Sequence, residues 1–272
     1  MDTSLSDKRI RISPSISNFR EKLLARTGLK EYRIYDIFRS CIFFGLYRPS
    51  DYFWFVLHRG KRKVFYCGSD ILRLPKWIKY FKATHYCENE VEQKALRKLG
   101  IEAKVCPMIF DDVKVPVSFK PSKKPHVYLT THPGRDKEYG VDKVAQFAHL
   151  FPQITFHIYG SLGIGESSGG IKGNIIWHGF TLENEFNEEI KNYQAALRLN
   201  QFDGFSEITA KSALMGQYPI SWISYPHITG ASNAKALRLA LNALSKKKEP
   251  NYEARKYWLK KLNESLWTIL TE

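Results

Sequence analysis

The stretch from Gln201 to Ser221, QFDGFSEITAKSALMGQYPIS, combines an acidic glycine turn with the start of a helix. Asp203 and Gly204 form a turn pair, and Ser206 is a residue type that caps helices. Apolar residues then recur at roughly helical spacing until Gly216, which is typical of a helix end. The free N–H groups at such a helix start suit an anion, or ligand hydroxyls beside an acidic side chain. The alternative is an ordinary turn, helix and strand of an α/β fold without a ligand.

Basic and aromatic residues interleave in two segments, HRGKRKVFY at 58–66 and KWIKYFK at 76–82. This composition fits a surface that faces phosphates and bases, or an interfacial helix on anionic lipid. Trp77, Tyr80 and Phe81 are also spaced like a stripe of a hydrophobic core. The residues alone leave both interpretations open.

Signatures of several other chemistries are missing from the sequence. The four cysteines are 26, 20 and 19 residues apart, which gives no close pair for zinc or for a redox switch. The eight histidines show no ligand spacing, and no strand is expected to end in Asp-x-Asp. The segment GSLGIGESSGG lacks the ending of a Walker loop, and its glycines predict a mobile loop. We therefore expect no metal and no cofactor.

The composition limits which classes of protein are possible. With 272 residues and 43% apolar residues, the chain suits two ordinary domains or one large one. Its apolar runs fall short of the roughly 20 residues that span a bilayer, so we predict a cytoplasmic protein, peripheral at a membrane at most. Residues 1–118 hold 23 basic and 13 acidic residues, and 119–272 hold 19 and 14. The first half is the better candidate to meet DNA, an anionic membrane surface or a phosphorylated ligand, and no protein partner is indicated.

The first half is predicted to be α/β after a variable start. Residues 1–15 look like a polar arm, and 17–39 like one or two helices. The expected strands are 41–47, 64–67, 84–87 and 103–109, and the expected helices are 74–81 and 89–99. Residues 49–51 look like a helix start, followed by an aromatic helix or strand up to residue 57. This alternation predicts a mainly parallel sheet covered by helices on both faces. The segment 111–125, rich in proline and lysine, is the predicted linker between domains.

A second alternation follows the linker. The expected strands are 126–131, 154–159, 174–177, 195–199 and 219–224, and the expected helices are 141–150, 182–192, 206–216, 233–244 and 252–270. Residues 132–140 are predicted to be a loop. Two open α/β domains place a ligand in the cleft between them, at the carboxyl ends of the strands.

The second half resembles the nucleotide-sugar domain of GT-B glycosyltransferases, especially the retaining group-one type. Gly134-Arg135 followed by Lys137 resembles the family's Gly-Arg strand end with its nearby lysine. The segment 174–180, NIIWHGF, is similar to the strand and glycine turn beside the nucleotide base. The block DGFSEITAKSALMGQYPIS then stands where the family has its Glu-Gly-Phe turn, helix and strand.

The first half carries a weaker resemblance to the same family. The segment 64–70, VFYCGSD, is similar to a strand that ends in His-Gly-Ser-Asp, with Cys67 in place of the histidine. The implied fold class is α/β, with two Rossmann-like open parallel-sheet domains that face across a cleft and a reduced first domain. The implied domains are an acceptor-side domain at 1–118, a nucleotide-sugar domain at 119–250, and a helix at 251–272 that returns towards the first domain.

The resemblance also implies a set of site residues. The implied catalytic residues are Asp203 and Asp70. The implied donor-binding residues are Gly134, Arg135, Lys137, Gly179, Phe180, Asp203, Gly204, Phe205, Ser206, Glu207 and Lys211. The implied acceptor-side residues are Cys67, Gly68, Ser69 and Asp70. Solvated loop charges, a self-capping Asp203 and a helix-capping Asp70 are the structural alternatives for these positions.

Four positions depart from the family pattern. The family pairs two glutamates eight positions apart, and here Asp203 and Lys211 stand in their places. Tyr139 stands where a lysine that binds the diphosphate is usual, and Cys67 replaces a histidine. These departures indicate an unusual donor or an unusual activity.

The main hypothesis is a metal-independent, retaining glycosyltransferase that uses a nucleotide sugar. Its expected acceptor is anionic, either a modified base in DNA or a lipid or glycan at a membrane. A binding module for nucleic acid or membranes that kept the shape but lost catalysis is the second hypothesis. A sugar-nucleotide epimerase is the third.

Overall fold

The computed structural model describes residues 7–162 and 171–271. By its internal contacts the chain divides into two compact units. The first unit consists of Met1–Asp112, Phe202–Phe205 and Lys260–Glu272, and the second of Val113–Gln201 and Ser206–Leu259. Each unit contains its own largely parallel sheet and its own buried apolar cores.

This division differs from the expected segments 1–118, 119–250 and 251–272. Residues 113–118 group with the second unit, where Val115 packs against an apolar core. Residues 202–205 group with the first unit because hydrogen bonds described below tie them to it. The end of the last helix also groups with the first unit, because its apolar side chains complete a core there.

The sheet of the first unit has six strands in the order β2-β1-β3-β4-β5-β6, and all neighbouring strands are parallel. Its strands are β1 (Arg9–Ile12), β2 (Lys30–Glu31), β3 (Cys41–Phe44), β4 (Arg62–Phe65), β5 (Thr84–Cys87) and β6 (Ala103–Val105). Its α-helices are α2 (Arg20–Thr27), α3 (Pro49–Leu57) and α4 (Glu90–Lys98). Its 3-10 helices are η1 (Pro14–Phe19), η2 (Ile34–Asp36), η3 (Ile71–Arg73) and η4 (Lys76–Tyr80).

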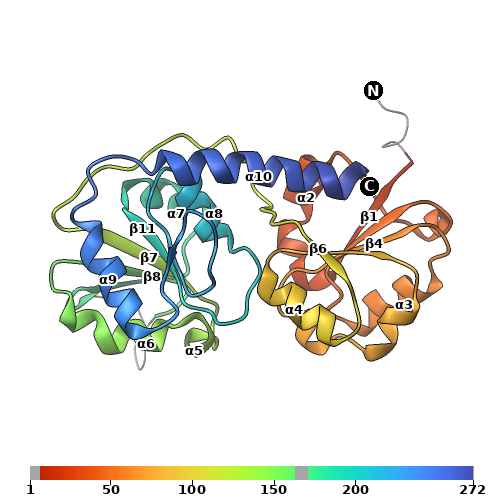
Figure 1. Ribbon diagram of the computed structural model, residues 1–272, viewed down its shortest axis with the longest axis horizontal. Helices are drawn as coiled ribbons and strands as arrows, with labels where there is room; N and C mark the ends of the chain where they lie inside the picture. The colour runs from red at the N-terminus through yellow and green to blue at the C-terminus, as the bar shows by residue number, and fades with distance from the viewer. Residues whose placement is uncertain (1–6, 163–170, 272) are drawn as a thin grey trace. The chain divides into compact units, whose positions relative to one another are not determined.

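Both faces of this sheet are covered, which explains why its strands look apolar throughout in the sequence. Successive residues of a strand point to opposite faces. Cys41 and Phe43 of β3 join a core with side chains of α3 and α4. Ile42 and Phe44 join a second core with side chains of α2 and of the last helix. Figure 1 shows α2 on one side of the sheet and α3 and α4 on the other.

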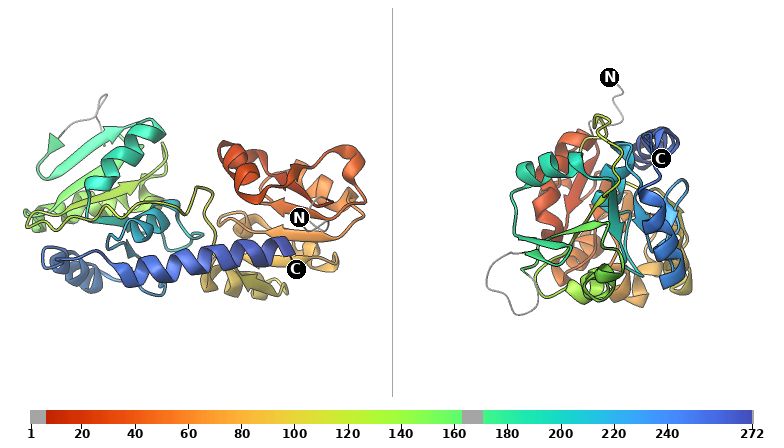
Figure 2. Two further views of the ribbon diagram at one scale, coloured as in Figure 1. Left: turned by 90° about the horizontal axis from the view of Figure 1, so that it is seen from above. Right: turned by 90° about the vertical axis from the view of Figure 1, so that its left-hand side faces the viewer.

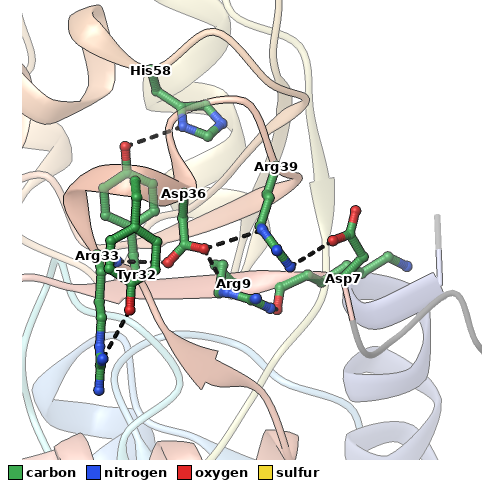
Figure 3. A network of polar contacts seen from close by, with 9 residues as sticks. Asp7, Arg9, Tyr32, Arg33, Asp36, Arg39 and His58 are labelled. Atoms are coloured by element: carbon green, nitrogen blue, oxygen red, sulfur yellow. Dashed lines mark hydrogen bonds and ion pairs between the residues drawn. The ribbon is translucent and has the colours of Figure 1, made fainter.

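Strand β1 corrects the prediction of a polar arm. The sequence RIRI alternates, so that Ile10 is buried in the core. Arg9 is also shielded, because its Nε donates to Oδ1 of the buried Asp36 at 3.0 Å. Arg39 Nε lies 3.3 Å from the same oxygen, and Figure 3 shows Asp36 among these arginines. Strand β1 is therefore anchored by an ion-pair network as well as by its apolar side chains.

The sheet of the second unit has seven strands in the order β13-β12-β11-β7-β8-β10-β9. Its strands are β7 (His126–Thr130), β8 (Thr155–Tyr159), β9 (Ile171–Lys172), β10 (Ile175–Gly179), β11 (Ala195–Arg198), β12 (Ile220–Ser221) and β13 (Thr229–Gly230). Its helices are α5 (Asp136–Tyr139), α6 (Val141–Phe147), η5 (Ala148–Leu150), α7 (Glu183–Glu189), η6 (Ile190–Asn192), α8 (Glu207–Leu214) and α9 (Ala234–Leu244). Only the edge strand β9 is antiparallel among the described strands.

Helices cover both faces of this sheet as well. Val127 and Leu129 of β7 pack with side chains of α6 and α9, and Tyr128 between them packs with side chains of α7 and α8. The two helix pairs lie on opposite sides of the strands in Figure 1. The fold class predicted from the βα alternation, two Rossmann-like α/β domains, is therefore confirmed.

The last helix, α10 (Tyr252–Thr271), begins in the second unit and ends in the first. Figure 2 shows it as one unbroken helix. Its last turns belong to the first unit, where Ile269 and Leu270 are buried. Lys63 Nζ donates to the carbonyl oxygen of Ile269 at 2.6 Å, so a buried cation caps the end of the helix.

Several local predictions were wrong. The helix predicted at 74–81 is the 3-10 helix η4, and the loop predicted at 132–140 contains the short helix α5. Strand β12 holds two residues of the predicted strand 219–224, because only these pair with a neighbour. The predicted mobile loop falls mainly on residues 163–170, which lie outside the described residues.

Candidate functional site

A cationic cluster lies at the carboxyl ends of β7 and β11 in the second unit. Tyr139 is buried at its centre, and the Cζ atom of Arg198 lies 4.3 Å from the centroid of the tyrosine ring. The Cζ atom of Arg135 lies 5.1 Å from the same centroid, and the ring of His132 contacts Tyr139 edge-on at 5.6 Å. Two guanidinium groups therefore contact the same aromatic ring.

The chain forms this cluster by turning sharply after β7. Gly134 has a φ of 76°, a conformation that glycine adopts without strain. The next residue, Arg135, precedes α5, and its Nε donates to Glu138 Oε2 at 2.7 Å. Lys137 is exposed on the same short helix. The structure thus brings predicted donor-binding residues together with Arg198, which the sequence analysis missed.

The charges of the cluster favour an anionic ligand. Burial lowers the pKa of His132, and the nearby Arg135 and Arg198 lower it further, so this imidazole is held neutral. A neutral imidazole can donate or accept a hydrogen bond, and guanidinium groups bind phosphate oxygens in bidentate fashion. Tyr139 stands where the glycosyltransferases that the sequence resembles usually have a lysine. Here its ring contacts two arginines.

The strand β10 ends in the predicted base-binding turn. Gly179 has a φ of 66°, and a Cβ atom there would lie 2.6 Å from Leu162 Cδ2. The next residue, Phe180, is 89% exposed in the part of the chain that the structure describes. An aromatic ring at the carboxyl end of a strand is a suitable surface on which a nucleobase can stack.

The predicted donor-binding residues at helix α8 make contacts that differ from those expected from the family pattern. Ser206 stands at the N-cap, but its side chain makes no capping hydrogen bond within the described residues. Lys211 is buried, and its Nζ donates to Asn187 Oδ1 at 3.0 Å and lies 3.9 Å from Glu183 Oε1. Lys211 therefore connects α8 to α7. Glu207 lies in the first turn of α8.

The predicted acceptor-side residues follow β4 in the first unit. Asp70 is fully buried, where its two carboxylate oxygens accept from Leu46 N and Cys67 N, each at 3.1 Å. Burial raises the pKa of Asp70 to about 7, although the backbone hydrogen bonds lower it. Asp70 thus joins the loops after β3 and β4, and its predicted catalytic role stays a prediction. Gly68 and Ser69 form the turn between Cys67 and Asp70.

The acidic glycine turn at 202–205 lies against the loop that follows β5. Asn89 Nδ2 donates to the carbonyl oxygen of Asp203 at 2.7 Å, and Phe205 N donates to Glu88 Oε2 at 3.1 Å. A Cβ atom on Gly204 would lie 1.7 Å from Glu88 Oε2, so a larger residue here would require the Glu88 side chain to move. Asp203 Oδ1 also accepts from Gly204 N at 3.0 Å, which is the self-capping contact expected of a turn aspartate.

Glu92 is an acidic residue that the sequence analysis did not single out. It is fully buried in α4, and its Oε2 accepts from Glu88 N at 2.7 Å. Its Oε1 has no hydrogen-bond partner among the described residues, and Cβ atoms added to Gly68 and Gly204 would lie 3.8 and 3.6 Å from it. Burial raises the pKa of Glu92 well above its usual value, and Asp70 and Asp203 raise it further. The Oε1 atom of this buried carboxyl group therefore faces two glycines.

A row of three histidines crosses the α7 side of the second sheet. His126 Nδ1 lies 2.8 Å from His157 Nε2, and His157 Nδ1 lies 2.9 Å from His178 Nε2. His178 Nδ1 then lies 3.6 Å from Glu189 Oε2. Burial lowers the pKa of His157 to about 3, and the two neighbouring imidazoles contribute. The spacing of these histidines along the sequence does not resemble that of metal ligands, because they come from three separate strands.

No group of His, Cys, Asp and Glu that could hold a metal ion occurs in residues 7–162 and 171–271. Over the same residues, no helix is long and apolar enough to cross a membrane. The four cysteines are free thiols, three of them buried.

The two units and their strand orders define a GT-B fold, the two-domain architecture of many glycosyltransferases. No protein-family model matches the sequence, and no curated protein sequence matches it either. Solved structures do match the fold. The chain is similar to TarM, with a TM-score of 0.60 and 12% identity over 85% of this chain, and it spans 54% of the length of TarM.

Two further structures share the fold. The lipopolysaccharide outer core galactosyltransferase WaaB has a TM-score of 0.56 and 14% identity, over 96% of this chain and 99% of WaaB. The sucrose-phosphate synthase from Thermosynechococcus elongatus has a TM-score of 0.57 and 11% identity, over 85% of this chain and 69% of the synthase. The resemblance predicted from the sequence is therefore confirmed at the level of the fold.

Proposed function

We propose that this protein is a glycosyltransferase that moves a sugar from a nucleotide sugar to an acceptor hydroxyl. The observation that carries this proposal is the cationic cluster of His132, Arg135 and Arg198 around Tyr139. Two guanidinium groups held 4.3 and 5.1 Å from one ring suit the two phosphates of a nucleoside diphosphate. Among structures with the same fold, TarM has been solved with UDP and the catalytic domain of starch synthase IV with ADP, which supports such a ligand.

The proposed reaction breaks the bond between the anomeric carbon and the diphosphate oxygen. The diphosphate leaves with the electron pair, and Arg135 and Arg198 stabilise its negative charge without a metal ion. The acceptor oxygen forms the new bond to the anomeric carbon on the same face, which retains the configuration. The proton of the acceptor hydroxyl passes to the departing diphosphate.

The remaining predicted residues have proposed roles around this centre. Phe180 stacks on the base beside Gly179, and Lys137 adds charge near the diphosphate. The turn Asp203-Gly204-Phe205 contacts the donor sugar, followed by Ser206 and Glu207 at the start of α8. Lys211 positions α8, and Asp70 positions the turn Cys67-Gly68-Ser69 on the acceptor side. Burial raises the pKa of Glu92 and so favours its protonated form, which can donate a hydrogen bond to a sugar or acceptor hydroxyl.

A panel of nucleotide sugars tests the function. We expect one of them to raise the melting temperature of the protein, and a ligand at 100 times its Kd stabilises by about 2.7 kcal/mol. Release of the nucleoside diphosphate with an acceptor extract, undiminished by EDTA, would establish metal-independent transfer, and NMR of the product would give its anomeric configuration. No stabilisation and no turnover with any donor would contradict the proposal.

The same assay separates two other functions. A binding module without catalysis would show salt-sensitive binding of DNA or lipid and no response to nucleotide sugars. The departures at Lys211, Tyr139 and Cys67 motivate this alternative. An epimerase would convert the nucleotide sugar itself without an acceptor. We propose an anionic acceptor, either a modified DNA base or a membrane lipid or glycan, and a cytoplasmic location.

A further inference from the structure

The outer surface of the first unit carries an apolar groove between α3 and η4. Its volume is about 380 Å³. Phe53, Val56, Leu57 and Trp77 form its walls, and Arg59 lies among the lining residues. We call it the α3–η4 groove. Its apolar side chains line the surface instead of packing in the core.

The aromatic side chains here face solvent although the sequence also fits a core stripe. Phe53 is 60% exposed, Trp77 is 38% exposed and Tyr80 is 78% exposed. The segment is a 3-10 helix, in which residues three apart lie on the same face, so Trp77 and Tyr80 are exposed together. Ile78 is the residue that enters the core instead. The ring of Trp77 is nevertheless fixed, because Tyr52 and Phe81 contact it edge-on at 5.9 and 5.7 Å.

The exposed charges of the segment that contains the groove residues are positive. Residues 37–87 contain ten lysines and arginines but only two acidic residues, Asp51 and Asp70. Both acidic side chains are buried, at 2% and 0% exposure. The exposed basic residues of this segment are Arg39, Arg48, Arg59, Lys61, Arg73, Lys76, Lys79 and Lys82. Every exposed formal charge of this segment is therefore a cation.

We propose that the α3–η4 groove docks the first unit onto an anionic lipid bilayer. Exposed Trp, Tyr and Phe side chains partition to the bilayer interface, and lysines around them meet anionic headgroups. Lys79 Nζ lies 5.2 Å from the centroid of Tyr80, an arrangement in which the amine extends over an aromatic ring towards water or headgroups.

The groove favours lipid over nucleic acid because of its lining. Its walls are aliphatic and aromatic, and among the residues that the structure describes Arg59 is the one charged residue that lines it. Nucleobases placed there would leave their polar edges without hydrogen-bond partners, whereas the acyl chain of a lipid has no hydrogen bonds to lose. This inference deepens the proposed function, because it places the acceptor at the membrane. The docking itself does not require a bound nucleotide sugar.

Vesicle sedimentation without nucleotide sugar tests the docking. We expect the full chain to bind vesicles of phosphatidylcholine and phosphatidylglycerol in equal amounts, and not phosphatidylcholine alone. Lys76→Glu and Lys79→Glu should each weaken binding about fivefold or more, since one basic residue near such a surface contributes about a factor of five. Phe53→Glu should weaken it at least tenfold.

Trp267→Glu is the matched control, because Trp267 is 60% exposed on α10, away from the groove lining. It should bind vesicles like the unchanged protein. Where Phe53→Glu fails to fold by circular dichroism, Phe53→Ser replaces it.

Equal binding to both kinds of vesicle, or binding that Phe53→Glu does not weaken, would overturn the proposal. So would tight binding of duplex DNA that Lys76→Glu abolishes in a protein that ignores vesicles. The melting-temperature response to nucleotide sugars is measured separately, so a failure of docking and a failure of the proposed function give different results.

Discussion

At the scale of single residues, the candidate site depends on side chains that meet only after folding. Arg198 is the last residue of β11, and Tyr139 is the last residue of α5, far apart in sequence. The Cζ atom of Arg198 lies 4.3 Å from the centroid of the Tyr139 ring. This contact adds a second guanidinium group to that of Arg135 in the Gly-Arg motif. Glu92 likewise looks like an ordinary polar residue of an amphipathic helix until its burial is known.

Replacing Arg198 with alanine should weaken the binding of a nucleoside diphosphate about 10- to 100-fold, because charge-assisted hydrogen bonds to phosphate are lost. Arg198→Lys should recover part of the affinity, since lysine keeps the charge but not the bidentate geometry. Isothermal titration calorimetry with UDP and ADP measures both. Arg238→Ala on the exposed side of α9 is the matched control and should bind normally.

Glu92→Gln should make the protein relatively more stable as the pH rises. Burial raises the pKa of Glu92 in the folded state, so the stability it contributes is present below its unfolded value and is lost as pH increases towards the folded pKa. The neutral amide removes this loss, which amounts to about 1.4 kcal/mol per pH unit across that window. Urea denaturation at pH 5 and pH 8 compares the two proteins. An identical pH dependence would mean that Glu92 is ionised in the folded protein.

At the scale of elements, the two sheets bury polar rows as well as apolar ones. Strands β7, β8 and β10 each place one histidine on the α7 side, and the three imidazoles are joined at 2.8 and 2.9 Å. Tyr193 OH lies 3.0 Å from His157 Nδ1, and burial raises the pKa of Tyr193 to about 12. With each Nδ1 protonated, the three neutral imidazoles form one hydrogen-bonded row, and His178 Nδ1 at its end lies 3.6 Å from Glu189 Oε2.

His157→Phe should flatten the loss of stability in acid. The folded protein keeps His157 neutral down to about pH 3, whereas the unfolded chain binds a proton near pH 6.5. This histidine alone therefore lowers the free energy of unfolding by about 1.4 kcal/mol for each pH unit below that value.

Urea midpoints at pH 7 and pH 5 test this prediction, with His149→Gln as a control at an exposed histidine. We expect the difference between the two midpoints to shrink in His157→Phe and not in His149→Gln. An unchanged difference would show that His157 does not control the acid sensitivity.

At the scale of the whole molecule, the end of the chain completes a core that its beginning builds. Ile269 and Leu270 are buried with Ile10, Ile42 and Phe44 in the first unit. Lys8 Nζ donates to the carbonyl oxygen of Leu270 at 2.5 Å, and Lys63 does the same for Ile269. The first unit therefore needs residues from both ends of the sequence.

Ile269→Ala should destabilise the protein by about 2–5 kcal/mol, because the side chain is 1% exposed and its loss leaves a cavity. Trp267→Ala, two residues earlier and 60% exposed, should change the stability by less than about 0.5 kcal/mol. Chemical denaturation measures both variants. Equal effects would mean that the last turns of α10 do not pack on the first unit.

The sequence by itself determined the class of fold and part of the local structure. The apolar periods of strands and helices predicted β5 to the residue, and α9 and α10 within a residue or two at their ends, because burial on one face repeats with the period of the element. The strand-end glycine turns with their charged neighbours, above all Gly134-Arg135, indicated the GT-B fold.

Only the tertiary structure decided which side chains share a site. The second guanidinium at Tyr139, the buried carboxyl of Glu92, and the grouping of 202–205 and 260–272 with the first unit all depend on contacts between distant segments. Sequence periodicity carries no information about such contacts, because it records which face of an element is buried and not which element buries it.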